Sequence, residues 1–116
     1  MTNDLWSHVL SGPMSGISDF NFPAFDAAAQ RLRAQGYYVF NPAESSREIG
    51  DGLEYNVYLR YCICKICLID MAWGGRNDGN RSVLVQLPGW ERSKGALAEY
   101  HLAVALGWKI EEYESC

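Results

Sequence analysis

Residues 83–87 read VLVQL, a short and almost continuously apolar stretch that runs into Pro88 and Gly89. Continuous apolar character over about five residues is typical of a central strand in a parallel sheet, because helices cover both of its faces. A helix is expected next, over residues 94–106, and Gly107 follows it where a glycine commonly ends a helix. This pair of elements predicts an α/β fold built on parallel strands.

The same alternation of strand and helix extends over the rest of the 116 residues. Further strands are expected at residues 7–11, 37–40 and 108–113, helices at about 21–35 and 53–68, a polar loop at 43–52 and a second loop at 73–82. The order βαβαβαβ predicts one domain, residues 1–116, with a parallel sheet of about four or five strands. The expected architecture is a three-layer fold, flavodoxin-like or Rossmann-like.

Composition and charge exclude several classes of function. The net charge is −4 and the isoelectric point is near 5, without a basic stripe that would neutralise phosphates, so nucleic acid is not an expected partner. A small anion held by backbone N–H groups remains compatible with this acidity. No apolar run approaches the roughly 18 residues of a membrane span, so no membrane partner is expected. The first residues do not form a secretory signal, and we expect a cytoplasmic protein.

Glu99 is the most informative acidic residue, because it lies in a helix of small and apolar residues. Apolar residues at 97, 98, 102, 103 and 106 form the stripe expected of a helix on a sheet, and Glu99 points partly away from that stripe. A carboxylate at a helix start, beside the carboxyl end of a strand, suits glycosidic-bond chemistry as nucleophile or as acid and base. The alternative is a solvated glutamate on the surface.

Three cysteines lie close together in the sequence, at Cys62, Cys64 and Cys67. This spacing permits a metal site. A helix here would spread the thiols around its circumference, and no histidine lies near them, so we expect small buried hydrophobic residues, no metal and no other cofactor. A metal or redox protein remains the third hypothesis for function.

Two segments that each follow a strand and lead into a helix should meet at one edge of the sheet. They are the turn at residues 11–16 and the segment at 88–95. Hydroxyl and backbone N–H groups of the turn are suitable donors to an anion, and the alternative is a plain tight turn. The central spatial prediction is that this turn faces Glu99 across a shared pocket.

Four short motifs together carry a resemblance to a known family: SGPMSG at 11–16, NFPAF at 21–25, NPAE at 41–44 and LPGWERSKG at 87–95. Over nearly its whole length the chain resembles the small, largely phage-associated DUF4406 family. The fold of that family is similar to nucleoside 2-deoxyribosyltransferases and deoxynucleoside 5′-monophosphate N-glycosidases. In those enzymes a glutamate attacks the anomeric carbon, the bond between base and deoxyribose breaks, and water or a second base resolves the glycosyl-enzyme.

The resemblance implies roles for individual residues. Glu99 matches the nucleophile of these enzymes. Ser93 matches the serine that meets the 5′-phosphate in the glycosidases, where the transferases carry an aspartate, and an additional role as a helix N-cap is compatible with this. The resemblance also implies a homodimer or a higher homo-oligomer, in which a neighbour's residues complete the site.

Two positions depart from the pattern of these enzymes. Val9 stands where they carry a tyrosine, and Cys62 stands where they carry an aspartate that is thought to handle the proton of the base. Asp70 matches a separate aspartate that ends the same helix. These departures support an alternative function, a catalytically impaired nucleotide-binding protein of the same fold.

Three other features have two interpretations each. Trp90 either stacks a base at the rim of the site or covers the edge of the sheet. Arg76 or Asp78 reaches the site from the loop at 73–82, or that loop is solvated. His101 lies on another helical face than Glu99 and is expected at the surface or in a dimer contact.

The sequence therefore predicts an N-glycosidase or deoxyribosyltransferase-like enzyme whose substrate is a small-molecule nucleotide. The expected catalytic residue is Glu99. The expected substrate-binding residues are Ser11, Gly12, Met14, Ser15, Gly16, Trp90, Ser93 and Gly95.

Overall fold

The computed structural model describes residues 8–50, 54–72 and 82–114. Its strands are β1 (His8–Ser11), β2 (Val39–Phe40), β3 (Val83–Gln86) and β4 (Lys109–Glu112), in one parallel sheet of order β2-β1-β3-β4. Its α-helices are α1 (Phe22–Ala34), α2 (Pro42–Ile49), α3 (Tyr55–Ala72) and α4 (Lys94–Ala105), and two 3₁₀-helices are η2 (Ser18–Asn21) and η3 (Trp90–Arg92). The expected parallel α/β fold is confirmed.

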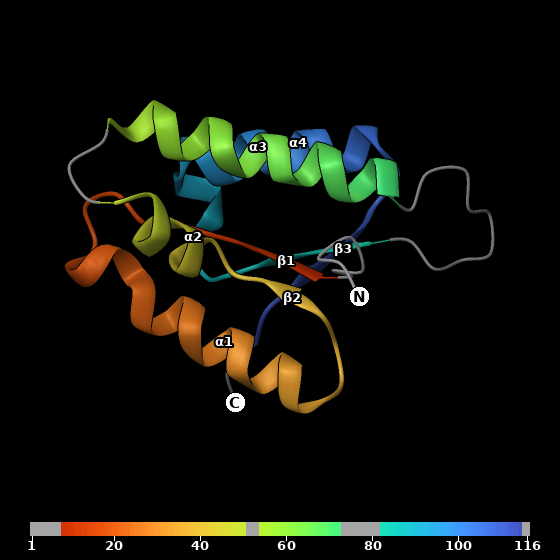
Figure 1. The fold of residues 1–116 in the computed structure, drawn as a ribbon, viewed down its shortest axis with the longest axis horizontal. Helices are drawn as coiled ribbons and strands as arrows, with labels where there is room; N and C mark the ends of the chain where they lie inside the picture. Colours follow the sequence, from red (N-terminus) through yellow and green to blue (C-terminus); the bar gives the residue numbers. More distant parts are fainter. Residues whose placement is uncertain (1–7, 51–53, 73–81, 115–116) are drawn as a thin grey trace.

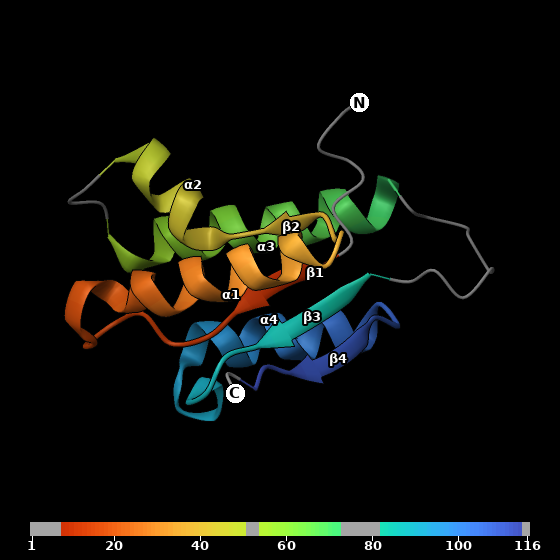
Figure 2. The ribbon, with the colours of Figure 1, turned by 90° about the horizontal axis from the view of Figure 1, so that it is seen from below.

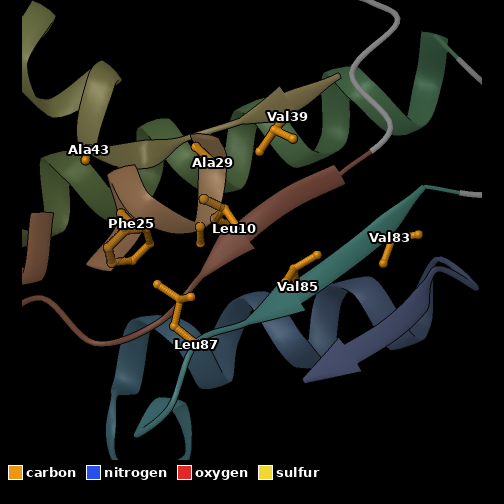
Figure 3. Close-up of a cluster of buried hydrophobic side chains, with 9 residues drawn as sticks. Leu10, Phe25, Ala29, Val39, Ala43, Val83, Val85 and Leu87 are labelled. Atoms are coloured by element: carbon orange, nitrogen blue, oxygen red, sulfur yellow. The ribbon is translucent and has the colours of Figure 1, made fainter. Parts of the chain in front are cut away.

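Helices cover both faces of the sheet, with α1 on one side and α3 and α4 together on the other (Figure 1). Alternate residues of each strand therefore enter two separate cores. Leu10 and Val85 pack with side chains of α1 (Figure 3), whereas Val9 and Leu84 pack with side chains of α3 and α4. This alternation decides which polar side chains at the strand ends face α4.

The segment after β2 differs from the expected polar loop, because it forms the helix α2. Asn41 caps this helix, with its side-chain oxygen accepting a hydrogen bond from the Ala43 N–H at 3.0 Å. Pro42 follows in the first turn, where the missing N–H has no helical partner to lose. Arg47 of α2 also forms an ion pair of 2.6 Å with Asp26 of α1. A loop was predicted because the local composition is polar. The prediction was wrong because Asn41 and Pro42 form a strong helix start.

The buried face of α4 also differs from the expected stripe. It consists of small residues and one carboxylate: Gly95, Ala96, Glu99 and Ala103. Of the residues assigned to the stripe only Ala103 is buried, while Leu97, Leu102 and Leu106 are half-buried and Ala98 is exposed. Small side chains allow a helix to approach a sheet closely, so the larger leucines lie along its flanks. This placement directs Glu99 into the protein.

The connection from β1 to α1 is irregular. Asn21 begins the helix expected at residues 21–35, but in the structure it precedes α1, it has a φ of 62° and its side chain does not cap the helix. Its Nδ2 instead donates a hydrogen bond of 2.9 Å to the carbonyl oxygen of Pro13. Asn21 thereby ties the start of α1 to the turn at residues 11–16.

Two element boundaries differ by a few residues. β2 begins at Val39 because Tyr37 still bonds to the end of α1, its N–H donating to the Leu32 carbonyl at 3.3 Å. α3 continues to Ala72. The loop expected at 73–82 lies outside the described residues except for Ser82, and so do the roles considered for Arg76 and Asp78.

Within the described ranges, no helix has the length and apolar character needed to cross a membrane.

Candidate functional site

The site lies at the carboxyl edge of the sheet, where β1 and α4 meet. Ser11 is the last residue of β1, and its Oγ donates a hydrogen bond of 2.5 Å to Oε1 of Glu99. The two residues are separated by 88 positions in the sequence. The turn after β1 and the carboxylate of α4 therefore meet, as the topology of a parallel sheet predicts.

Glu99 is buried, so the alternative of a solvated surface glutamate is wrong. Its relative exposure is 7%, and burial raises the pKa of its carboxyl group to about 7, although the hydrogen bond from Ser11 acts in the opposite direction. Near neutral pH both protonation states of this carboxyl group are populated. A carboxyl group tuned in this way can act as a nucleophile or can exchange a proton with a ligand.

A cavity of about 50 Å³ adjoins the carboxyl group of Glu99. Four helices and the end of β1 contribute to its wall, which consists of Ser11, Gly12, Met14, Phe25, Pro42, Ser46, Tyr58, Leu59, Cys62, Ser93, Gly95, Ala96 and Glu99. As it stands this inner cavity has room for a few water molecules. Its wall is mostly apolar, with hydroxyl groups at a few positions, which is the usual composition of a small-molecule site.

A second, outer cavity of about 260 Å³ lies next to the inner one and shares Met14 and Ser93 with it. Its other lining residues are Pro13, Ser15, Arg92 and Lys94. The side chains of Arg92 and Lys94 are exposed, and neither forms an ion pair with an acid in the described part of the chain. Two exposed cations beside two serine residues form an environment that attracts anions.

Ser93 lies between the two cavities and caps α4. Its Oγ accepts a hydrogen bond of 3.2 Å from the Ala96 N–H, which confirms the expected N-cap role. The positive end of the helix dipole is directed toward the same place. Ser93 therefore lines both cavities while it holds the start of the helix that carries Glu99.

Gly12 allows the two connecting segments to lie close together. A Cβ atom at Gly12 would lie 2.8 Å from the Cβ of Leu87, closer than real Cβ atoms approach. The Leu87 N–H also donates a hydrogen bond of 2.7 Å to the Ser11 carbonyl. The missing side chain thus lets the segment after β3 pack against the turn after β1, beside the inner cavity.

Most of the expected binding residues adjoin one cavity or the other. Ser11, Gly12, Met14, Ser15, Ser93 and Gly95 do so, together with Glu99. Gly16 and Trp90 line neither of the two cavities. Gly16 is an exposed turn residue with a φ of 78°.

Trp90 packs beside the sheet edge rather than facing a cavity. Its ring stacks on Tyr100 with 5.1 Å between centroids, and its Nε1 donates a hydrogen bond of 3.3 Å to Glu112 of β4. These contacts agree with the interpretation of Trp90 as a cover for the edge. His101 is exposed, as expected, and contacts the Tyr100 ring edge-on at 5.3 Å.

The three cysteines are spread around α3. Cys62 lines the inner cavity, and burial together with the nearby Glu99 charge raises the pKa of its thiol, which stays protonated at neutral pH. Cys67 is half-buried and Cys64 is exposed, so the expectation of buried cysteines is wrong for Cys64. Among the described residues, no three His, Cys, Asp or Glu side chains are grouped to hold a metal ion.

Several lining residues of the inner cavity were missing from the expected binding set, and three of them depend on α2 and on the face that α3 presents. Pro42 and Ser46 reach the inner cavity from α2, which was expected to be a loop. Tyr58 lines it from α3 and donates a hydrogen bond of 2.5 Å to the Gly50 carbonyl, joining the two helices. A strong Asn-Pro helix start at positions 41 and 42 was the available signal.

Of the two positions that depart from the resembling enzymes, Cys62 lines the inner cavity, whereas Val9 lines neither cavity, and neither does Asp70. Val9 is fully buried under α3 and α4, two residues before Ser11. Asp70 accepts a hydrogen bond of 2.9 Å from Nε1 of Trp108, and it does not line either cavity. Asp70 therefore has a structural contact that joins α3 to the segment before β4.

Comparison with known families gives one match. A family model described as a domain of unknown function (DUF4406) matches residues 7–112. No curated protein and no solved structure matches the chain.

Proposed function

The chain belongs to the DUF4406 family, and we propose that it is a nucleotide N-glycosidase or a deoxyribosyltransferase-like enzyme. In this proposal it cleaves the N-glycosidic bond of a (deoxy)nucleoside 5′-monophosphate. Glu99 is the nucleophile, and the inner cavity is the place where it meets the sugar. The phosphate binds at the outer cavity.

The observation that carries this proposal is the placement of Glu99. A buried carboxyl group that faces a cavity and accepts a hydrogen bond from Ser11 is held in one orientation. Fixed orientation is what nucleophilic attack on an anomeric carbon requires, because that carbon becomes oxocarbenium-like in the transition state. With a pKa of about 7, the group is ionised in half of the molecules at that pH.

The chemistry proceeds in two steps. In the first step an oxygen of Glu99 bonds to C1′, the C1′–N bond breaks, and its electron pair leaves with the base, which takes a proton from water. In the second step the oxygen of a water molecule bonds to C1′, and the ester bond between C1′ and the Glu99 oxygen breaks, with its electron pair returning to the carboxylate. The proton that this water gives up neutralises the hydroxide left by the first step. The products are the free base and 2-deoxyribose 5-phosphate. Transfer to a second base in place of water is the transferase version.

The outer cavity supports the choice of a phosphorylated substrate. It places the cations of Arg92 and Lys94 and the hydroxyls of Ser15 and Ser93 next to the inner cavity. Serine adds a donor at this point without the repulsion that a carboxylate would exert on a phosphate. A nucleoside 5′-monophosphate is the simplest ligand that presents a sugar to Glu99 and an anion to these groups.

Incubation with a panel of deoxynucleoside 5′-monophosphates, followed by chromatography of free base, tests the proposal. We expect base release from the wild-type chain and none above background from Glu99→Gln, because the amide is a poor nucleophile. Glu91→Gln is the matched control, since Glu91 is exposed on η3 near the same edge. Undiminished release by Glu99→Gln would remove Glu99 from the mechanism.

A second candidate function is a catalytically impaired nucleotide-binding protein. The buried thiol of Cys62 stays protonated and uncharged in the inner cavity, so it does not replace a carboxylate that would manage the proton of the base. Val9 is apolar and contributes no hydroxyl group. This candidate predicts nucleotide binding in calorimetry without any release of base over hours.

Ser93→Asp distinguishes binding at the outer cavity from binding elsewhere. Aspartate is as good an N-cap as serine, so α4 should keep its start, while the new charge repels the phosphate. We expect affinity for a nucleoside 5′-monophosphate to fall at least tenfold, with Ser93→Asn as the uncharged control. Equal affinity of Ser93→Asp and wild type would show that the phosphate assignment is wrong.

We propose a homodimer or higher homo-oligomer on the basis of the resemblance. The outward faces of α3 and α4 expose large apolar side chains, with Leu68, Met71 and Val104 at 55%, 66% and 50% relative exposure. Light scattering of the purified chain tests this, and a monomer mass at all concentrations would contradict it.

A further inference from the structure

Gln86 is a buried polar residue that the nucleotide chemistry above does not use. It is the last residue of β3, its relative exposure is 1%, and its Nε2 has no hydrogen-bond partner among the described residues. Buried donors in folded proteins nearly always have a partner, and an exception at a functional site calls for an explanation.

Gln86 is the neighbour of Ser11 in the sheet. The two residues are register partners at the carboxyl ends of β3 and β1, and adjacent strands lie about 4.8 Å apart. Leu84, two residues earlier on β3, packs in the core beneath α3 and α4. Because side chains alternate along a strand, Gln86 faces the same side as Leu84, which is the side of α4.

Geometry along α4 places Gln86 beneath Glu99. α4 contacts β3 and runs alongside it (Figure 2). Ala103 of α4 shares the buried core with Leu84. Along β3, the distance from Leu84 to Gln86 is about 6.6 Å toward the carboxyl edge. Along α4, the distance from Ala103 back to Glu99 is about 6 Å in the same direction. The two steps end at neighbouring positions, and the Ser11–Glu99 hydrogen bond fixes the same point independently.

From this geometry we infer that Gln86 is a positioning residue: its side-chain amide, which has no partner among the described residues, turns to the carboxylate of Glu99 when that group is ionised and then acts as a second donor beside Ser11. Gln86 does not line the inner cavity, so it acts through Glu99 and does not touch the substrate. Its effect on turnover rests on the proposed function. Its effect on the Glu99 carboxylate does not.

The inference has a direct consequence for the titration of Glu99. Hydrogen bonds to the charged form of a carboxyl group lower its pKa and oppose the effect of burial. Among the described residues, Ser11 on β1 already lowers this pKa through its hydrogen bond, and the Cys62 thiol on α3 lies close enough for the charge of Glu99 to raise its own pKa. Removing the donor of Gln86 should therefore raise the pKa of Glu99 above its value in the wild-type chain.

Gln86→Met tests this, because methionine has a similar length and lacks the donor. Titration of the ¹³C-labelled glutamate carboxyl signals, with Glu99 assigned by its loss in Glu99→Gln, gives the pKa. We expect a rise of about one unit, which is tenfold in the ionisation constant. Ser82→Ala is the matched control, since Ser82 is also buried and its Oγ also lacks a partner in the described chain, but it precedes the amino end of β3. We expect Ser82→Ala to leave the pKa unchanged.

The wild-type chain provides a second measurement that does not depend on a variant folding. The ¹⁵N and ¹H signals of the Gln86 side-chain amide should shift with pH at the same midpoint as the Glu99 carboxyl. The inference would be overturned by an unchanged Glu99 pKa in Gln86→Met. It would also be overturned if the signals of the Gln86 side-chain amide did not shift with the titration of Glu99. Both readings are independent of turnover, so lack of base release would count against the proposed function alone.

Discussion

At the scale of single residues, Glu99 illustrates how function and stability oppose each other. Burial in the folded chain raises its pKa to about 7 from an ordinary value of 4.5. The folded chain therefore binds this proton more tightly than the unfolded chain between these two pH values. Stability must fall as the pH rises through that window, because the charged form is less favourable in the folded state.

Glu99→Gln should therefore stabilise the protein at pH 8 and have little effect near pH 4. The raised pKa corresponds to about 3 kcal/mol between the two states at 1.36 kcal/mol per unit, so we expect a gain of about 1–3 kcal/mol at pH 8. Urea unfolding of both chains at several pH values measures it, and the difference between the chains cancels the other titrating groups. Equal stability at pH 8 would contradict the burial of an ionised Glu99.

The burial of Glu99 could not be predicted from its helix alone. Larger apolar residues such as Leu97 and Leu102 suggest one inner face, whereas the sheet accepts the face made of Gly95, Ala96 and Ala103. The choice between these faces depends on how closely α4 approaches the sheet, which is a tertiary property. Gln86 likewise reads as part of an apolar strand, and only the structure shows that its Nε2 is buried without a partner among the described residues.

At the scale of elements, α2 shows where local composition misleads. Its residues are mostly polar, but Asn41 and Pro42 together form a strong helix start. Asn41 is 1% exposed, and it joins two elements, since its Nδ2 also donates a hydrogen bond of 3.0 Å to Asp26 on α1. The helix start was therefore readable from positions 41 and 42, whereas the hydrogen bond to Asp26 depends on where α1 packs.

Asn41→Ala should destabilise the protein by about 1–2 kcal/mol, because it removes a cap and leaves buried groups without partners. Arg47→Ala is the comparison: it also breaks a contact to Asp26, but that ion pair is exposed to solvent, so we expect a smaller loss of stability than for Asn41→Ala. Thermal unfolding of both variants checks the order. A larger effect of Arg47→Ala would show that the ion pair, and not the cap, holds α2 against α1.

At the scale of the whole molecule, topology was the part of the site that the sequence predicted well. Parallel strands bring the turn after β1 and the start of α4 to one edge, and the Ser11–Glu99 hydrogen bond confirms that meeting. The division into an inner and an outer cavity was not predictable, because it depends on residues from six different elements. Trp90 and Gly16 belong to the motifs that carry the resemblance, but they line neither cavity.

The distribution of charge over the molecule also differs from its net value. The chain has a net charge of −4, while its outer cavity carries two cations. An anionic ligand is repelled by the molecule as a whole and attracted locally by Arg92 and Lys94. Close charges dominate over distant ones in salt solution, since screening acts over about 8–10 Å. The local cations should therefore control the affinity for a nucleoside 5′-monophosphate.

Lys94→Ala and Lys109→Ala separate the two effects, because each removes one positive charge. Lys94 lines the outer cavity, whereas Lys109 begins β4 at the opposite edge of the sheet. Calorimetry should show that Lys94→Ala weakens binding of a deoxynucleoside 5′-monophosphate about three- to tenfold, while binding of the matching nucleoside is unchanged. Lys109→Ala should leave both affinities near those of the wild type. Equal losses in the two variants would mean that net charge, and not the outer cavity, governs binding of the phosphate.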